Sequence, residues 1–309
     1  MRSTLRRALP LPFALFLALS CGPSAGPPAE AITPTTPPPT EIAPAAPEAP
    51  ATANAPAAEH EAPAAAEQDT YEVIAGVRYI ELLTGDAAAT DELPMVIAIH
   101  GLGDRPENFA GLLQGLAQPA RVILPAGLKP SDDGFSWFDV RARSRDVDAL
   151  AKGIGDASDT LAAFIDTVSA ERPTLGKPIV TGFSQGGMLS FAIAAGHPES
   201  VSAAFPVSGW LPPPLWPEAG PKGAPTPVVA LHGDADNAVL IEPTRLAVAR
   251  LQELGYSVEL REYPEVRHQI TAEMRGVLWS LLRGATEELA AGKAVSTPAP
   301  APKRTAMPG

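Results

Sequence analysis

Ser184 has the surroundings that nucleophilic chemistry needs. It is the third residue of the string G-F-S-Q-G at 182–186, between an apolar segment at 178–183 and a helical segment at 185–195. A G-x-S-x-G turn between a strand and a helix strains the backbone of its serine and lets the two elements approach closely. The helix N-terminus then directs backbone N–H groups at negative charge near the hydroxyl. The pattern predicts a nucleophile elbow, and a glycine-rich turn with a capping serine is the alternative.

Chain order supplies a base and an acid for Ser184. Hydrolases with this elbow carry the serine first, then an acid, then a histidine. After Ser184 the only aspartates are Asp234 and Asp236, and the only histidine that follows them is His268. Both aspartates come directly after a strand-like segment, at the edge of a sheet where sites form. We therefore predict a triad of Ser184, His268 and one of the two aspartates, and we expect His232 to order the end of its own strand.

Strand-like and helical segments alternate through the middle of the chain. The strand-like segments are short apolar runs, which are typical of strands covered on both faces. We expect strands at 73–83, 95–100, 121–125, 178–183, 201–207, 228–232 and 258–263. The segments between them are expected to be helical at 109–116, 147–168, 185–195, 243–254 and 271–283. The alternation predicts an α/β fold with a mostly parallel central sheet flanked by helices on both faces.

Four strings together resemble the acyl-protein thioesterase, or carboxylesterase/lysophospholipase, family of the α/β-hydrolases. They are H-G-L-G-D at 100–104, S-W-F-D at 136–139, G-F-S-Q-G-G at 182–187 and H-G-D-A-D-N-A-V at 232–239. The resemblance implies the α/β-hydrolase fold and a serine esterase that hydrolyses carboxylic (thio)esters through a Ser-Asp-His triad and an acyl-enzyme. It implies a small ester or lipid substrate, such as an acyl ester or a lysophospholipid, and neither a metal nor an organic cofactor.

The family pattern also assigns roles to residues. In the family pattern H-G-x-x-D-x-x-V the aspartate is the catalytic one. It matches Asp236, the second aspartate of the string at 232–239, and so selects Asp236 over Asp234. The residue matching Leu102 and the residue after the nucleophile, Gln185, supply the backbone N–H groups of the oxyanion hole. Three further residues are expected to line the acyl site: Asp104, Trp137 and Phe138. For the two aromatic residues a place in the core is the alternative, and the Pro-rich stretch 212–227 either shapes the pocket mouth or is an ordinary rigid loop.

Two features separate this chain from the family. Leu240 stands where the family usually has proline, and residues 1–20, which we expect to be an export leader, precede a domain that is typically intracellular. We therefore do not expect protein-bound palmitate as the substrate. Two other functions stay open: a secreted esterase of the feruloyl-esterase or polyhydroxybutyrate-depolymerase kind, with the same triad and a different pocket, and a surface-displayed binding module without catalysis.

The composition argues against several classes of protein. The 309 residues carry a formal net charge of −12, which argues against nucleic acid as a partner because phosphate binding needs clustered Lys and Arg. The single cysteine excludes an internal disulfide and a Cys-based zinc cluster. No apolar run reaches the ~18 residues that an ordinary membrane-spanning helix needs.

Both ends of the chain differ in composition from the middle. Residues 1–20 join a basic start to a short apolar run and are predicted to be a signal peptide. The string L-A-L-S-C at 17–21 resembles a bacterial lipoprotein signal, so residues 21–68 are expected to be a lipidated Cys21 and a disordered tether dominated by Pro and Ala. A catalytic domain at 69–291 and a disordered tail at 292–309 complete the predicted organisation. The expected location is the bacterial cell envelope, with secretion as a soluble enzyme as the alternative.

The lipid anchor can be tested by detergent partitioning. We expect the protein expressed in a bacterial host to enter the Triton X-114 phase, because several acyl chains on Cys21 hold a protein at a membrane where one chain holds it only weakly. The Cys21→Ser variant should stay in the aqueous phase. If both proteins partition into water, the anchor hypothesis fails.

Overall fold

The computed structural model describes residues 71–298. The expected signal peptide, Cys21 and the tether lie outside the described residues, as does the tail after residue 298. None of the helices in the described part is both long and apolar enough to span a membrane.

An eight-stranded sheet forms the centre of the described domain, with the strand order β1-β2-β4-β3-β7-β8-β9-β10. The strands are β1 (Glu72–Ile74), β2 (Val77–Thr84), β3 (Met95–Ile99), β4 (Ala120–Pro125), β7 (Ile179–Phe183), β8 (Ala203–Val207), β9 (Val228–Gly233) and β10 (Val258–Tyr263). From β4 to β10 all neighbours are parallel, whereas the pairs β1–β2 and β2–β4 are antiparallel. This arrangement confirms the predicted mostly parallel sheet.

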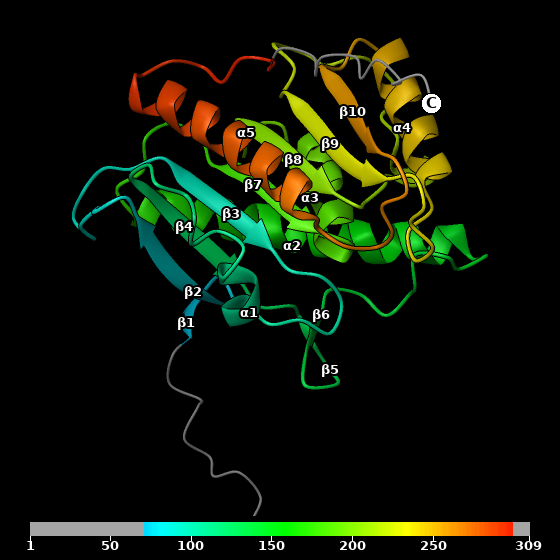
Figure 1. The fold of residues 1–309 in the computed structure, drawn as a ribbon, viewed down its shortest axis with the longest axis horizontal. Helices are drawn as coiled ribbons and strands as arrows, with labels where there is room; N and C mark the ends of the chain where they lie inside the picture. Colours follow the sequence, from blue (N-terminus) through cyan, green and yellow to red (C-terminus); the bar gives the residue numbers. More distant parts are fainter. Residues whose placement is uncertain (1–70, 299–309) are drawn as a thin grey trace, which may run out of the picture. The chain divides into compact units, whose positions relative to one another are not determined.

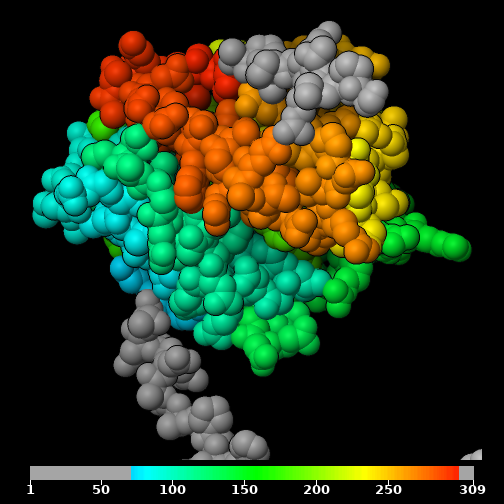
Figure 2. All heavy atoms as spheres, viewed as in Figure 1, coloured from blue at the N-terminus to red at the C-terminus, as the bar shows by residue number. Residues whose placement is uncertain are grey.

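Helices cover both faces of the sheet. They are α1 (Pro106–Ala110), α2 (Val147–Glu171), α3 (Gln185–Gly196), α4 (Ile241–Glu253) and α5 (Ala272–Ala290). Successive residues of a strand point to opposite faces, so Ile97 packs with α2, α3 and α4 while Val96 packs with α1 and α5. In Figure 1, α5 crosses in front of the sheet and α2 and α3 lie behind it. The space-filling view shows α5 as an orange band across the same face (Figure 2).

Some boundaries differ from the sequence prediction. The expected strand at 73–83 is two strands, because Ala75 and Gly76 both have positive φ angles, 48° and 78°, and form a tight turn between β1 and β2. The expected helix at 109–116 begins earlier, with Pro106 in its first turn, and gives way to turns after residue 110. Helix α5 continues to Ala290 instead of ending near residue 283.

One hairpin was absent from the sequence prediction. It consists of β5 (Lys129–Ser131) and β6 (Gly134–Ser136), which pair with each other outside the main sheet. Its strands are only three residues long and carry no apolar alternation, so no sequence pattern indicated them. A single turn of 3-10 helix, η1 (Pro213–Leu215), lies in the Pro-rich stretch.

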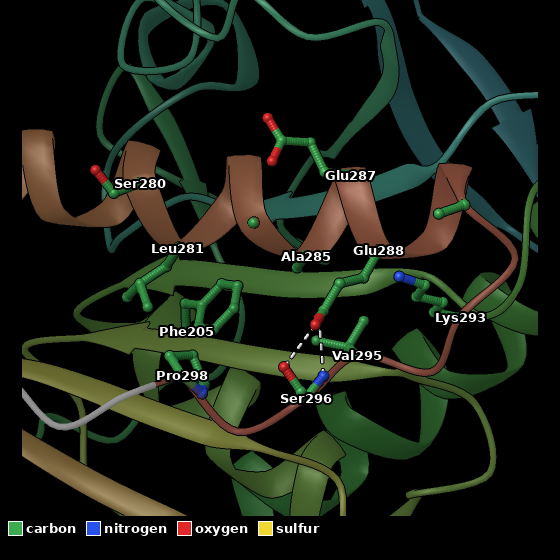
Figure 3. Close-up of a pocket in the computed structure, with 12 residues that line it drawn as sticks. Phe205, Ser280, Leu281, Ala285, Glu287, Glu288, Lys293, Val295, Ser296 and Pro298 are labelled. Atoms are coloured by element: carbon green, nitrogen blue, oxygen red, sulfur yellow. Dashed lines mark hydrogen bonds between the residues drawn. The ribbon is translucent and has the colours of Figure 1, made fainter.

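After α5 the described chain folds back along the same helix. Figure 3 shows Glu288 of α5 accepting hydrogen bonds from the backbone N–H of Ser296 (2.8 Å) and from its hydroxyl (2.5 Å). The helix, this returning segment and Phe205 of β8 enclose a cavity of about 380 Å³ that contains none of the predicted triad residues. Residues 292–298, which the sequence analysis assigned to the tail, are thus held against α5.

Strand β7 and helix α3 approach each other closely at two glycines. A Cβ atom added at Gly186 would lie 2.0 Å from the carbonyl oxygen of Ile99 in β3, and one at Gly182 would lie 2.5 Å from the carbonyl oxygen of Gly186. These neighbours are backbone atoms of the central sheet and of α3, so they cannot turn aside as a side chain can. The absence of a side chain at both positions therefore lets α3 begin directly against the strand ends.

This close approach predicts a large effect from one methyl group. We expect Gly186→Ala to lower the free energy of unfolding by about 3 kcal/mol, because overpacking forces backbone shifts. The matched control is Gly276→Ala in α5, where a Cβ would meet nothing within 4 Å. Alanine there should raise the free energy of unfolding by up to ~1 kcal/mol through its better helix propensity. Urea unfolding followed by circular dichroism measures both, and equal effects would contradict the packing argument.

Candidate active site

Ser184 occupies the sharp turn between β7 and α3. Its backbone angles are φ 56° and ψ −113°, in a region that residues with a side chain rarely adopt. The turn is held by the Ser184 N–H, which donates to the carbonyl of Val207 in β8 (3.0 Å). Strain of this kind persists only where the surrounding structure enforces it, so the sheet and α3 together fix the position of the hydroxyl.

His268 and Asp236 complete a chain of hydrogen bonds from Ser184. The Ser184 Oγ lies 3.0 Å from His268 Nε2, and His268 Nδ1 lies 2.7 Å from Asp236 Oδ2. Ser184 follows β7, Asp236 follows β9 and His268 follows β10. Because these strands run parallel, their carboxyl ends meet at one edge of the sheet and bring together residues 84 positions apart. The His268 ring also packs on Phe183, with ring centroids 4.7 Å apart.

The two aspartates of the 232–239 loop have different surroundings. Asp236 is buried, and its Oδ1 accepts the N–H groups of Ala238 and Val239, both at 2.9 Å. Asp234 is exposed, and its Oδ1 accepts the N–H of Glu265. Of the two aspartates, Asp236 contacts His268 and Asp234 does not. Residue types and chain order alone could not tell which of them is the partner of His268.

Hydrogen bonding sets the charge state of Asp236. Burial by itself raises the pKa of this carboxyl, but the neighbouring His232 ring and the hydrogen bonds from His268 and from the Val239 N–H outweigh it and hold the pKa well below the usual aspartate range. The carboxylate is therefore ionised, which favours a proton on Nδ1 of His268 and leaves Nε2 free to accept from Ser184.

His232 lies beneath Asp236 and does not reach Ser184. Its ring is fully buried, with Nε2 2.9 Å from the carbonyl of Val239 and Nδ1 3.1 Å from the Thr244 hydroxyl. Its Nε2 is 3.6 Å from Asp236 Oδ2, a longer contact than that of His268. These bonds hold the end of β9 and the following loop in place, as expected for this histidine.

The two expected oxyanion donors come from different elements. Gln185 is the first residue of α3, and the N–H of a first helical residue has no acceptor within its helix. Leu102 lies in the loop after β3 and lines a cavity that Ser184 and Gln185 also line. The hairpin holds this loop: the Gly103 N–H donates to the Phe135 carbonyl (2.8 Å), and the Phe135 N–H donates to the Asp104 carbonyl (3.0 Å).

Two buried polar side chains fix the backbone on either side of these donors. The Gly127 N–H donates to His100 Nε2 (3.0 Å), so the ring proton lies on Nδ1, 2.6 Å from the Gly101 carbonyl. Burial lowers the pKa of His100 and keeps the ring neutral. The Gln185 side chain donates to the Phe138 carbonyl (2.9 Å) and accepts from the Trp137 N–H (3.1 Å). Sequence analysis missed the positioning role of His100, although it begins the H-G-L-G-D string.

A cavity of about 460 Å³ opens over Ser184 and His268. Of the three residues expected to line the acyl site, Asp104 does so, whereas Trp137 and Phe138 do not. Both aromatic side chains are buried in the core, where the Trp137 indole donates to the His100 carbonyl and Phe138 packs against α2 at Gly153. The prediction that Trp137 and Phe138 line the acyl site is therefore wrong, and the alternative, a place in the core, is correct.

The Pro-rich stretch 212–227 lies away from this cavity. Its residues 217–226 line a separate hollow with the end of α3 and Tyr256. Trp216 points back to its own loop and donates to the Leu211 carbonyl (2.8 Å). None of its residues lines the cavity above Ser184, so the alternative of an ordinary loop describes the stretch better than a place at the pocket mouth. Within residues 71–298 no cluster of His, Cys, Asp and Glu side chains is arranged to hold a metal ion.

Comparison with known proteins identifies clear relatives. A family model described as "Phospholipase/Carboxylesterase" matches residues 86–282. A probable carboxylesterase of Oryza sativa subsp. japonica is 31% identical over 201 residues, which are 60% of this chain and 76% of the relative. Acyl-protein thioesterase 1 of Gibberella zeae is 26% identical over 219 residues, covering 63% of this chain and 92% of the relative.

Solved structures agree on the fold. Zea mays acyl-protein thioesterase 2 superposes with a TM-score of 0.54 at 25% identity, covering 66% of this chain and 97% of that chain. The esterase PE8 superposes with a TM-score of 0.58 at 23% identity, covering 67% and 98%. These matches confirm the α/β-hydrolase fold that the sequence predicts.

The lowered pKa of Asp236 predicts a pH-dependent contribution to stability. A carboxyl whose pKa is lower in the folded than in the unfolded chain stabilises the fold above its unfolded pKa of about 3.9, and this stabilisation is lost as the pH falls below that value. The free energy of unfolding of the wild type should exceed that of Asp236→Asn most above about pH 5, and the difference should shrink from pH 5 to pH 3. Urea unfolding across this range measures it.

Asp234→Asn serves as the control for this measurement, since Asp234 is exposed and lies in the same loop. Its pH dependence should follow that of the wild type. A difference between the wild type and Asp236→Asn that stays constant from pH 6 to pH 3 would show that Asp236 is not stabilised as a carboxylate.

Proposed function

The chain belongs to the phospholipase/carboxylesterase family and is a carboxylic ester hydrolase, and on that basis we propose that Ser184, His268 and Asp236 are its catalytic triad. The observation that supports this most directly is the pair of hydrogen bonds that join Ser184 Oγ to His268 Nε2 and His268 Nδ1 to Asp236 Oδ2. Side chains in this order have the geometry that acyl transfer from an ester to water requires.

The first half of the proposed reaction forms an acyl-enzyme. Ser184 Oγ attacks the ester carbonyl carbon while its proton passes to His268 Nε2. Asp236 holds the imidazole in the required tautomer and stabilises the imidazolium that forms. The N–H groups of Leu102 and Gln185 donate to the oxygen that becomes negative. When the tetrahedral intermediate collapses, His268 returns the proton to the leaving alcohol or thiol, and the acyl group stays on Ser184.

The second half releases the acid and restores the enzyme. Water gives a proton to His268 Nε2 as its oxygen attacks the acyl carbon, and the same two N–H groups receive the oxyanion. Collapse breaks the bond to Ser184 Oγ, which takes the proton back from His268. The products are a carboxylic acid and the free alcohol or thiol, and the chemistry uses only groups of this chain.

The proposed substrates are small acyl esters, thioesters or lysophospholipids that fit the cavity above Ser184. A volume of about 460 Å³ accommodates a short or medium acyl group together with part of its alcohol. A panel of 4-nitrophenyl esters of rising chain length would show which acyl length is turned over fastest. It would also separate this proposal from the feruloyl-esterase or depolymerase alternative.

Substitution of the triad residues tests the mechanism. We expect Ser184→Ala and His268→Ala each to lower kcat for a 4-nitrophenyl ester by about 10⁶, because a triad acts as a unit. Asp236→Asn should lower kcat by roughly 10⁴ because the histidine then adopts the wrong tautomer. A fluorophosphonate probe should label the wild type and should not label Ser184→Ala.

Asp234→Asn is the matched control in the same loop, and it should keep most of the activity. Circular dichroism should show every variant folded. Turnover retained by folded Ser184→Ala, or a greater loss in Asp234→Asn than in Asp236→Asn, would refute the assignment.

A further inference from the structure

We propose that Arg141 and Arg143 make this active site select esters that carry an anionic group, a carboxylate or a phosphate, near the ester bond. The inference rests on the proposed function, because it concerns the cavity above Ser184. It goes further by naming the charge of the substrate and the residues that recognise it.

The two arginines lie on the wall of the catalytic cavity. Arg141, Ala142 and Arg143 line it together with Ala238 and Val239, above Ser184 and His268. They belong to the segment that leads into α2, which begins at Val147. The arginine part of this wall therefore comes from a segment other than the loops that carry Ser184, Asp236 and His268.

One guanidinium is held beside the triad loop. Arg143 Nη1 donates to the carbonyl of Asn237 at 3.0 Å. Asn237 is the residue after Asp236, so this bond fixes the Arg143 side chain next to the loop that carries the acid of the proposed triad. A guanidinium has five N–H donors in a fork that matches carboxylate and phosphate, and one bond to Asn237 leaves several donors for a ligand.

The charges around the cavity are unbalanced. Among the described residues neither arginine forms an ion pair, and both are exposed. The one carboxylate on the wall is Asp104, whose Oδ1 accepts from the Arg105 N–H (2.8 Å) and from Asn108 Nδ2 (3.1 Å). The cavity wall therefore carries two guanidinium groups that form no ion pair within the described residues and one carboxylate that is already hydrogen-bonded.

The positive charge of these two arginines contrasts with the negative net charge of the whole chain. The chain carries −12, and a net charge of that sign repels anions at long range. Arg141 and Arg143 place two positive charges, without an ion pair in the described part of the chain, on the wall where a substrate would bind. Such an arrangement lowers KM for an anionic ester and leaves a neutral one without that advantage.

A structural role for Arg143 is the competing explanation, since its bond to Asn237 also ties two loops together. If Arg143 only held the two loops together, its loss would affect all esters alike. Charge recognition would affect only the charged esters. The test therefore compares two matched pairs of substrates. With the charge on the acyl side, they are mono-4-nitrophenyl adipate and methyl 4-nitrophenyl adipate. With the charge on the alcohol side, they are 4-acetoxybenzoate and its methyl ester.

We expect the wild type to have a higher kcat/KM for the anionic member of at least one pair, and that pair shows on which side the charge is recognised. Arg141→Gln and Arg143→Gln should each lower the anionic-to-neutral ratio of kcat/KM by about fivefold, which is the range for exposed ion pairs. The loss should come through KM. Sodium chloride at 0.5 M should lower the ratio for the wild type and much less for the double variant, because salt screens exposed charges.

Arg145→Gln is the matched control, because Arg145 is exposed in the same segment but does not line the cavity. It should leave the ratio unchanged, and Arg143→Lys should restore part of what Arg143→Gln loses. Equal losses for both members of each pair, or a wild-type preference for the neutral members, would overturn the proposal. Failure of the proposed function would look different, since neither member of a pair would then depend on Ser184.

Discussion

The proposed active site of this protein depends on the close contact of α3 with the ends of β3 and β7. A single added methyl group at Gly186 would fall 2.0 Å from the Ile99 carbonyl oxygen. Because the helix begins so close to the sheet, the turn between them has to be sharp, and Ser184 is held at a φ of 56°. The same contact places the first N–H of α3 beside the hydroxyl. The packing of α3 against the strand ends thus produces both the backbone strain at Ser184 and the position of the N–H group that could bind an anion.

The parallel sheet brings the other two residues of the proposed triad to Ser184. Asp236 and His268 lie on loops that follow β9 and β10, and the register of these strands brings both loops to the same edge of the sheet. The loops are then stiffened locally. Asp236 accepts two backbone N–H groups, and the buried ring of His232 holds the same turn from below. A carboxylate with these donors keeps its charge although it is buried, so it can orient His268 without being protonated itself.

The sequence predicted the parts of the site that depend on local patterns and chain order. Apolar runs and small residues around Ser184 identify a strand, an elbow and a helix, and the scarcity of Asp and His after it leaves few partners. The sequence failed where a residue's neighbours are distant in the chain. The hairpin at 129–136 has no periodic pattern of its own, and its role appears only when β6 bonds to the loop at Gly103 and Asp104. Trp137 and Phe138 follow that hairpin, and their burial is decided by α2 and His100, which no local rule includes.

The residues proposed to carry out the hydrolysis and those proposed to recognise the charge of the substrate lie on different segments of this fold. Ser184, Asp236 and His268 are fixed by the sheet, so a change in their positions would require a change in strand packing. Arg141 and Arg143 lie on a segment that leads into α2, and among residues 71–298 one hydrogen bond, from Arg143 to Asn237, joins this segment to the loop of Asp236. Both arginine side chains are exposed, so replacing them alters the charge of the cavity wall, whereas Ala142 between them packs against the core. On the proposal above, the two arginines would set the preference for an anionic ester, while Ser184, Asp236 and His268 would carry out the same hydrolysis whatever the charge of the ester.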